Sequence, residues 1–169
     1  DELVAATRRG VEVRVLFDDM GSWTVNRRFF RNMQKNGIDV HPFMRVAFPN
    51  PSLRINYRNH RKIVVIDGKI GYIGGMNIAD RYVNGDDDHS WRDTHLRIEG
   101  PAVHGLQFSF AIDWSYECKT LLSGDFYFPQ IEPAGDKGIQ IITSGPIGGW
   151  ENIALICQQI VSTASRYVY

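Results

Sequence analysis

The residues best suited to chemistry in this sequence are gathered in one short stretch. They are, in chain order, His60, Lys62, Asp67, Gly75 and Asn77. An apolar, β-branched run separates Lys62 from an Asp-Gly dipeptide that begins at Asp67, and this pattern predicts a β-hairpin. Because side chains alternate along a strand, we expect His60 and Lys62 to project from one face, about 6.6 Å apart along the chain. An imidazole and an ammonium group would then share one space.

Such a pair suits the chemistry of phosphodiesters. A neutral imidazole attacks phosphorus or moves a proton, while cations and amide donors stabilise the non-bridging oxygens. We expect Lys62 and Asn77 to provide that stabilisation. Asp67 belongs to the same pattern, although its place in an Asp-Gly turn favours a role in fixing the hairpin. For an isolated H-x-K sequence, a solvated surface hairpin would be the simpler interpretation. The spacing of the residues that follow must therefore distinguish a reactive site from a surface hairpin.

The wider spacing is specific: H-x-K-x4-D, six further residues, and then G-G-x-N. It resembles the HKD motif of the phospholipase D superfamily. The segments YRNHRK at 57–62 and WRDTH at 91–95 look like those of bacterial cardiolipin synthases in particular. The resemblance covers roughly the whole chain and implies an α/β fold: a phospholipase D-like half with a mixed, mainly parallel sheet flanked by helices. The chain would contain the first of two motifs.

The resemblance also implies a mechanism. One motif histidine attacks the phosphate of phosphatidylglycerol and forms a phosphatidyl-histidine, while the histidine of the other motif protonates the departing glycerol. A second phosphatidylglycerol then attacks and yields cardiolipin. On this chain His60 would be either the nucleophile or the acid and base. Asp93, on a downstream strand, would orient His60 by accepting from its second ring nitrogen; an ion pair with Arg92 is the alternative. The residues expected to contact substrate are Tyr57, Arg58 and Gly75.

The charges are unevenly distributed in a chain of ordinary globular composition, with 43% hydrophobic and 22% charged residues and no net charge. Residues 27–69 contain ten Lys and Arg against two Asp, and residues 80–137 contain eleven Asp and Glu against five Lys and Arg. The basic block includes the HKD-like stretch, as a site for an anionic phosphodiester would. A solvated basic face without a ligand is the alternative. The acidic run at 86–88 would suit a hard cation, but the motif chemistry needs no metal, and we expect neither metal nor cofactor.

The order of the predicted elements is that of a phospholipase D-like domain, a linker and the start of a second such domain. We place these parts at residues 1–119, 120–137 and 138–169. At the end of the first strand, Asp18 and Asp19 are expected to cap or turn, with a role at the edge of the site as the alternative. Packing is expected to explain the aromatic and aliphatic residues of the long helix. The predicted elements are a helix ending at Gly10, strands at 11–17, 38–44, 63–66, 70–73, from 93 and at 138–143, and helices at 23–36, 78–82, 101–118 and 150–164.

The expected partners are phosphatidylglycerol, an anionic membrane surface and a second HKD half-site from elsewhere in a longer protein. The chain by itself is expected to be soluble and inactive, to leave an apolar face uncovered and to form a homodimer through that face. The whole protein is expected at the cytoplasmic membrane. Two other classes of function stay open: a phospholipase D-type phosphodiesterase or nuclease that acts as a dimer, and a non-catalytic module that binds anionic lipid or nucleic acid.

Overall fold

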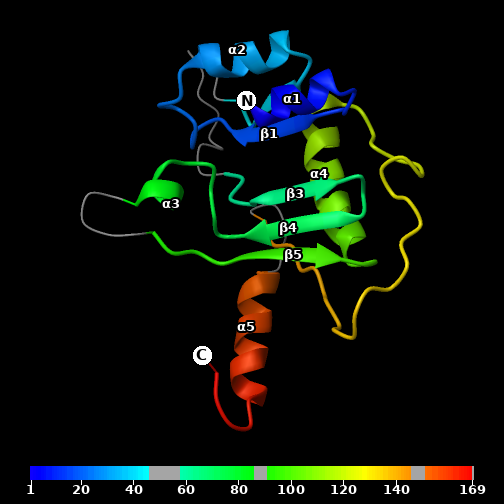
Figure 1. Cartoon of the computed structure of the whole chain (residues 1–169). Coiled ribbons are helices and arrows are strands. Elements are labelled where there is room, and N and C mark those ends of the chain that lie inside the picture. The colour runs from blue at the N-terminus through cyan, green and yellow to red at the C-terminus, as the bar shows by residue number, and fades with distance from the viewer. Residues whose placement is uncertain (46–57, 86–90, 146–150, 169) are drawn as a thin grey trace.

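The computed structural model describes residues 1–45, 58–85, 91–145 and 151–168, and it is an α/β structure with two small sheets (Figure 1). Among the described residues no helix is both long enough and apolar enough to cross a membrane. The elements are α1 (Glu2–Arg8), β1 (Arg14–Asp18), α2 (Arg27–Lys35), β2 (Asp39–Phe43), β3 (Ile63–Ile66), β4 (Ile70–Gly74), α3 (Arg81–Asn84), β5 (His95–Glu99), α4 (Val103–Cys118) and α5 (Asn152–Thr163).

The first sheet is the parallel pair that the opening strand-helix-strand pattern predicts. Strands β1 and β2 pair in parallel, with Arg14 opposite Asp39, and α2 forms the crossover between them. Helix α2 begins later than expected because the side chain of Asn26 caps it, accepting a hydrogen bond from the Arg28 backbone N–H at 2.9 Å.

The second sheet is antiparallel, with strand order β3-β4-β5. The α/β class is therefore confirmed, but the expectation of a mixed, mainly parallel sheet is wrong in detail, because this second sheet is entirely antiparallel. The reason is local: Asp67 and Gly68 join β3 to β4 with positive φ angles of 52° and 66°, as a tight hairpin turn requires. A parallel connection would need a crossover of a dozen or more residues.

Helix α4 packs against both sheets and carries most of the core (Figure 1). Its first half buries Val103 and Leu106 against Ile98 and the inner residues of β3 and β4. Its second half buries Trp114 with Leu122 and the side of Leu16 in β1. The expectation that packing explains all the large apolar residues of this helix is wrong for one face. Phe108, Ile112 and Tyr116 are exposed by 60%, 52% and 42%.

The C-terminal part agrees only partly with the expected pattern. Helix α5 forms close to the predicted range and projects away from the sheets (Figure 1). Residues 138–145 contain no strand, so the prediction of one at 138–143 is wrong. A strand is stable only where its backbone groups find a neighbouring strand, and no described strand pairs with this segment.

Candidate active site

The antiparallel pairing brings three chain segments to one end of the second sheet. Ile63 at the start of β3 lies opposite Ile73 near the end of β4, and Gly74 lies opposite His95 at the start of β5. The residues just before β3, just after β4 and just before β5 therefore meet at the end of the sheet that lies next to α3 (Figure 1). Five of the expected site residues lie in these segments: His60, Lys62, Gly75, Asn77 and Asp93. Asp67 lies in the turn at the opposite end of the hairpin, which fits the turn role.

His60 lies in a tight loop rather than on a strand. Strand β3 begins at Ile63, as predicted, so His60 and Lys62 precede the strand, and the expectation that they project from one face stays a prediction. Asn59 Oδ1 accepts from the Arg61 backbone N–H at 3.0 Å, a local turn that Asn side chains favour. Lys62 Nζ donates to the His60 carbonyl oxygen at 2.7 Å. The His60 side chain is exposed, and its ring makes no hydrogen bond to any described residue.

Asp93 lies directly against Gly75. A Cβ atom added to Gly75 would come within 2.5 Å of Asp93 Oδ2, so the carboxylate keeps its present position only beside a glycine. The Gly75 backbone N–H donates to the Thr94 carbonyl at 3.1 Å, and the Thr94 N–H donates to Asp93 Oδ1 at 2.7 Å. Although both residues are described, the ring of His60 forms no hydrogen bond with Asp93 in this structure, and the role of Asp93 in orienting His60 stays a prediction.

The cations next to His60 differ in how their charge is compensated. Arg58 Nε lies 3.5 Å from Asp18 Oδ1, and Arg61 donates to Asp113 Oδ2 at 2.8 Å. Lys62 has no carboxylate within ion-pairing distance among the described residues; only the His60 carbonyl engages it. Its positive charge is thus available to an anion.

Asn77 supplies a further donor at this end of the sheet. The residue is exposed, and its Nδ2 lies 3.4 Å from the Tyr82 hydroxyl on α3, a long and weak hydrogen bond. Tyr57 lies outside the described residues, as does the acidic run at 86–88. Among the residues that the structure describes, no three His, Cys, Asp or Glu side chains are grouped so as to hold a metal ion.

Two carboxylates hold the loop of His60, and sequence reasoning found only one of them. Asp18, expected as a turn residue with an alternative role at the edge of the site, accepts from the Gly21 N–H and, at 2.8 Å, from the Asn59 N–H. Asp113, on α4, accepts from Asn59 Nδ2 at 2.7 Å as well as from Arg61. Burial raises the pKa of the Asp113 carboxyl above its ordinary value, although Arg61 and Asn59 act in the opposite direction. The sequence hinted at the role of Asp113 only by placing an acidic residue within a mainly apolar helix.

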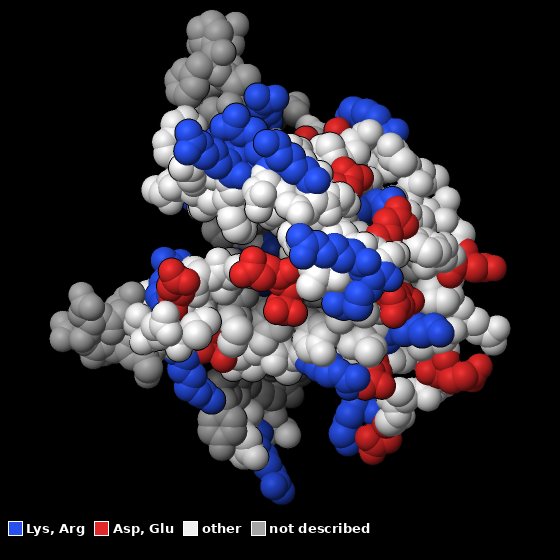
Figure 2. Space-filling model, turned by 45° about the horizontal axis from the view of Figure 1, so that its top comes forward, with Lys and Arg blue, Asp and Glu red and all other residues white. Residues whose placement is uncertain are grey.

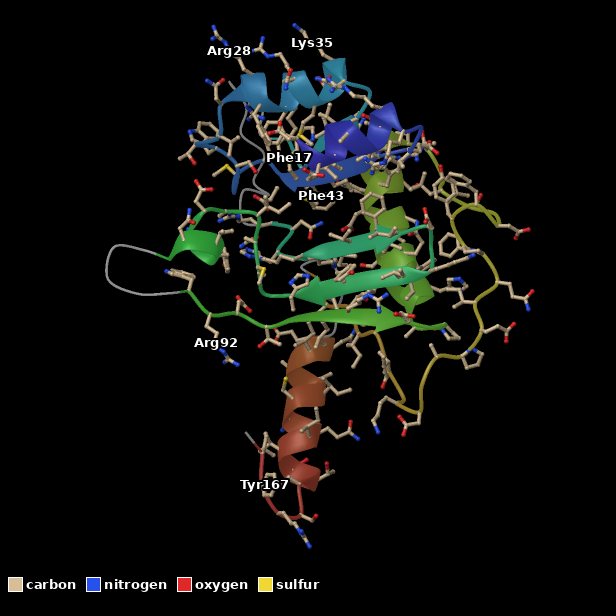
Figure 3. The ribbon with its side chains drawn as sticks, viewed as in Figure 1. Phe17, Arg28, Lys35, Phe43, Arg92 and Tyr167 are labelled. Atoms are coloured by element: carbon tan, nitrogen blue, oxygen red, sulfur yellow. The ribbon has the colours of Figure 1, made fainter. Side chains whose placement is uncertain are left out.

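The basic block divides into two parts in space. Arg58, Arg61 and Lys62 lie beside His60, whereas the cations of α2 cover an outer face of the molecule (Figure 2). Arg28 and Lys35 point away from the protein body (Figure 3), and Arg27 forms an ion pair with the buried Asp19 at 2.7 Å. The block is therefore not one continuous lining of the candidate site.

Comparisons with known proteins give a consistent result. Residues 1–111 match the family described as cardiolipin synthase, PLD-like domain. The chain is 41% identical over 171 residues to the major cardiolipin synthase ClsA of Bacillus subtilis (strain 168), covering 99% of this chain and 36% of that protein. It is also 41% identical over 172 residues to a cardiolipin synthase of Staphylococcus aureus (strain N315), covering 100% of this chain and 35% of that protein. The chain thus spans about a third of the length of these relatives.

Proposed function

The chain belongs to the family of cardiolipin synthase PLD-like domains, and we propose that it supplies one half-site of a phosphatidyltransferase that makes cardiolipin from two phosphatidylglycerol molecules. The observation that carries the proposal is the meeting of His60, Lys62, Asn77 and Asp93 at one end of the β3-β4-β5 sheet. Lys62, which has no carboxylate within ion-pairing distance among the described residues, follows the exposed His60 by two residues, and such a cation suits a phosphodiester.

Each of these residues has a distinct part in the proposed reaction. A ring nitrogen of His60 attacks the phosphorus of phosphatidylglycerol, or His60 protonates the leaving oxygen while the other motif's histidine attacks. Lys62 and Asn77 stabilise the negative charge on the phosphoryl oxygens, and the loss of one such donor costs about 3 kcal/mol. In the substrate complex, Asp93 would accept from the second ring nitrogen of His60 and so select the tautomer that faces phosphorus.

The proposed reaction needs a second half-site. With one half-site alone, a single imidazole would have to be both the occupied nucleophile and the acid that protonates the departing glycerol. The loss of general acid catalysis alone lowers the rate typically 10²–10⁴-fold. None of His41, His89, His95 and His104 begins an H-x-K sequence. We therefore propose that the 169-residue chain is inactive as a monomer, and that residues 120–137 link it to a second domain that starts at 138.

An exposed apolar stripe on α4 supports a partner of this kind. Phe108, Ile112 and Tyr116 follow one another at spacings of four residues, which places them on one side of the helix. Exposed apolar surface of this type marks an interaction site. The occupant that fits the proposed function is a second half-site, from a longer chain or from a second copy of this chain.

A nucleic-acid phosphodiester is the competing substrate, because the exposed cations of α2 would attract either polyanion (Figure 2). Binding to nucleic acid would weaken steeply with salt and would not depend on lipid. Sedimentation with vesicles of phosphatidylglycerol or phosphatidylcholine, with single-stranded DNA as competitor, separates the two. Selective retention on phosphatidylglycerol supports the lipid enzyme, whereas displacement by DNA with no lipid preference contradicts it.

The activity itself is tested by comparing two chains. A longer chain that extends through a second motif should transfer phosphatidyl groups between phosphatidylglycerol molecules, and the 169-residue chain should not. If the 169-residue chain matches the longer chain while light scattering shows a monomer, the requirement for two half-sites is wrong.

A further inference from the structure

The loop that carries His60 is held from both sides by side chains of distant elements. We call residues 58–62 the His60 segment. On one side of His60, the Asn59 backbone N–H donates to Asp18 Oδ2 at 2.8 Å. On the other side, the Arg61 guanidinium donates to Asp113 Oδ2 at 2.8 Å. The residues immediately before and after His60 are thus both anchored outside the loop.

Asp113 is the acceptor that joins the two sides. The same oxygen, Oδ2, accepts from Asn59 Nδ2 at 2.7 Å and from Arg61 at 2.8 Å. Asn59 in turn accepts from the Arg61 backbone N–H through its Oδ1. These three hydrogen bonds form a closed ring through Asn59, Arg61 and Asp113, and the side chain of His60, between Asn59 and Arg61, stays exposed.

The position of Asp113 makes it a firm anchor. It lies on α4 next to Trp114, which is 2% exposed and packs in the core beneath the first sheet. A carboxylate on this helix has little freedom to move, so it fixes the position of the His60 segment rather than moving with it. Hydrogen bonds to an ionised acceptor are also shorter and stronger than neutral ones.

We propose that Asp113 is a positioning residue for His60: by accepting from Asn59 and Arg61 at once, it fixes the backbone of the His60 segment and hence the direction of the imidazole. The proposal rests on the proposed function, in which His60 meets the phosphate. Asp113 itself does not touch the substrate in this account. It acts through the two residues that flank His60, and Asp18 supports the same loop at Asn59.

The test measures phosphatidyl transfer in a chain that carries both half-sites. Asp113→Asn keeps the shape of the side chain but removes the charge that holds Arg61, and Arg61→Gln removes the same contact from the exposed side. We expect both variants to lower kcat by 10- to 100-fold, the range in which a misplacement of about 1 Å acts, with KM changed by less than about threefold. The control is Asp136→Asn, the same chemical change at an exposed residue that forms an ion pair with the exposed Lys137.

A second readout separates positioning from general stability. In ¹⁵N NMR spectra of the 169-residue chain, Asp113→Asn should shift the backbone amides of Asn59 and Arg61 and the ring nitrogens of His60, while amides of β4 stay in place. If Asp113→Asn unfolds the protein, Arg61→Gln decides the question. Wild-type kcat in Arg61→Gln, or a loss confined to KM, overturns the proposal.

The same assay tests the proposed function separately, through the variant His60→Ala. Loss of transfer in His60→Ala together with wild-type kcat in Asp113→Asn and Arg61→Gln overturns the positioning role and leaves the function standing. Retained transfer in His60→Ala overturns the function, and the positioning role falls with it.

Discussion

Replacement of Gly75 by alanine tests whether Asp93 must stay where it lies. The added Cβ would come within 2.5 Å of Asp93 Oδ2 and 2.6 Å of its Cγ, whereas ordinary contact begins at 3.4 Å. Because Asp93 Oδ1 lies closer still, the carboxylate must move by about 1 Å or more. A displacement of that size at a reacting group costs about 10²-fold in rate, or about 2.7 kcal/mol in transition-state stabilisation.

Gly75→Ala should lower the activity and leave the stability of the fold nearly unchanged. Gly75 is exposed, and its obstacle is the end of a side chain that is free to turn away. At the preceding residue the situation is opposite: a Cβ on Gly74 would lie 2.6 Å from the backbone Cα of His95. Gly74→Ala should thus destabilise the β4-β5 pair by about 1–3 kcal/mol, as overpacking does, while Gly75→Ala changes the free energy of unfolding by less than about 1 kcal/mol.

The assay combines phosphatidyl transfer, in a chain with both half-sites, with urea unfolding of the 169-residue chain. Gly138→Ala is the matched control, because nothing lies within 4 Å of a Cβ at that position. A folded Gly75→Ala variant with the transfer rate of the control would refute the role of Asp93 in orienting His60.

Three further expectations concern the ligand, the core and pH. In NMR titrations with inorganic phosphate, the largest shifts should come from His60, Lys62 and Asn77; shifts only elsewhere would contradict the site. Leu106→Ala, at a fully buried position, should lower the free energy of unfolding by about 2–5 kcal/mol in urea. Burial raises the pKa of Asp113, so the folded state binds the proton of this carboxyl more tightly than the unfolded state does. The resulting contribution to stability is fully present below the unfolded pKa of about 3.9 and is lost as pH rises through the folded pKa. Relative to Asp113→Asn, the wild type should thus be more stable at pH 4 than at pH 7; the opposite trend would show that the ion pair with Arg61 outweighs burial.

Local sequence patterns predicted the parts of the fold that local chemistry determines. The Asp-Gly pair of the hairpin, the parallel strands around α2 and the long helix α4 all follow from turn residues and periodicity. Some ends of elements were less accurate: helix α2 begins later than predicted, because capping by Asn26 depends on atomic detail.

Contacts between distant segments were beyond the reach of the sequence. Arg61 and Asp113 are 52 residues apart, and nothing in the spacing of either residue points to the other. The split into two sheets, and the exposed stripe on α4, likewise depend on which surfaces the tertiary structure covers. The residues at the end of the second sheet were found because the motif spacing itself carries them.

The most direct test of the proposed function is the formation of cardiolipin from phosphatidylglycerol vesicles by a chain with both half-sites, with and without His60. Replacement of His60 by alanine should reduce the rate by at least 10²-fold. His104→Gln is the control, since His104 Nε2 lies 2.9 Å from the Pro129 carbonyl, away from the site, and glutamine preserves a donor there. Loss of cardiolipin formation in His60→Ala alone is the predicted result; equal rates in the two variants would contradict the assignment of His60 to the reaction.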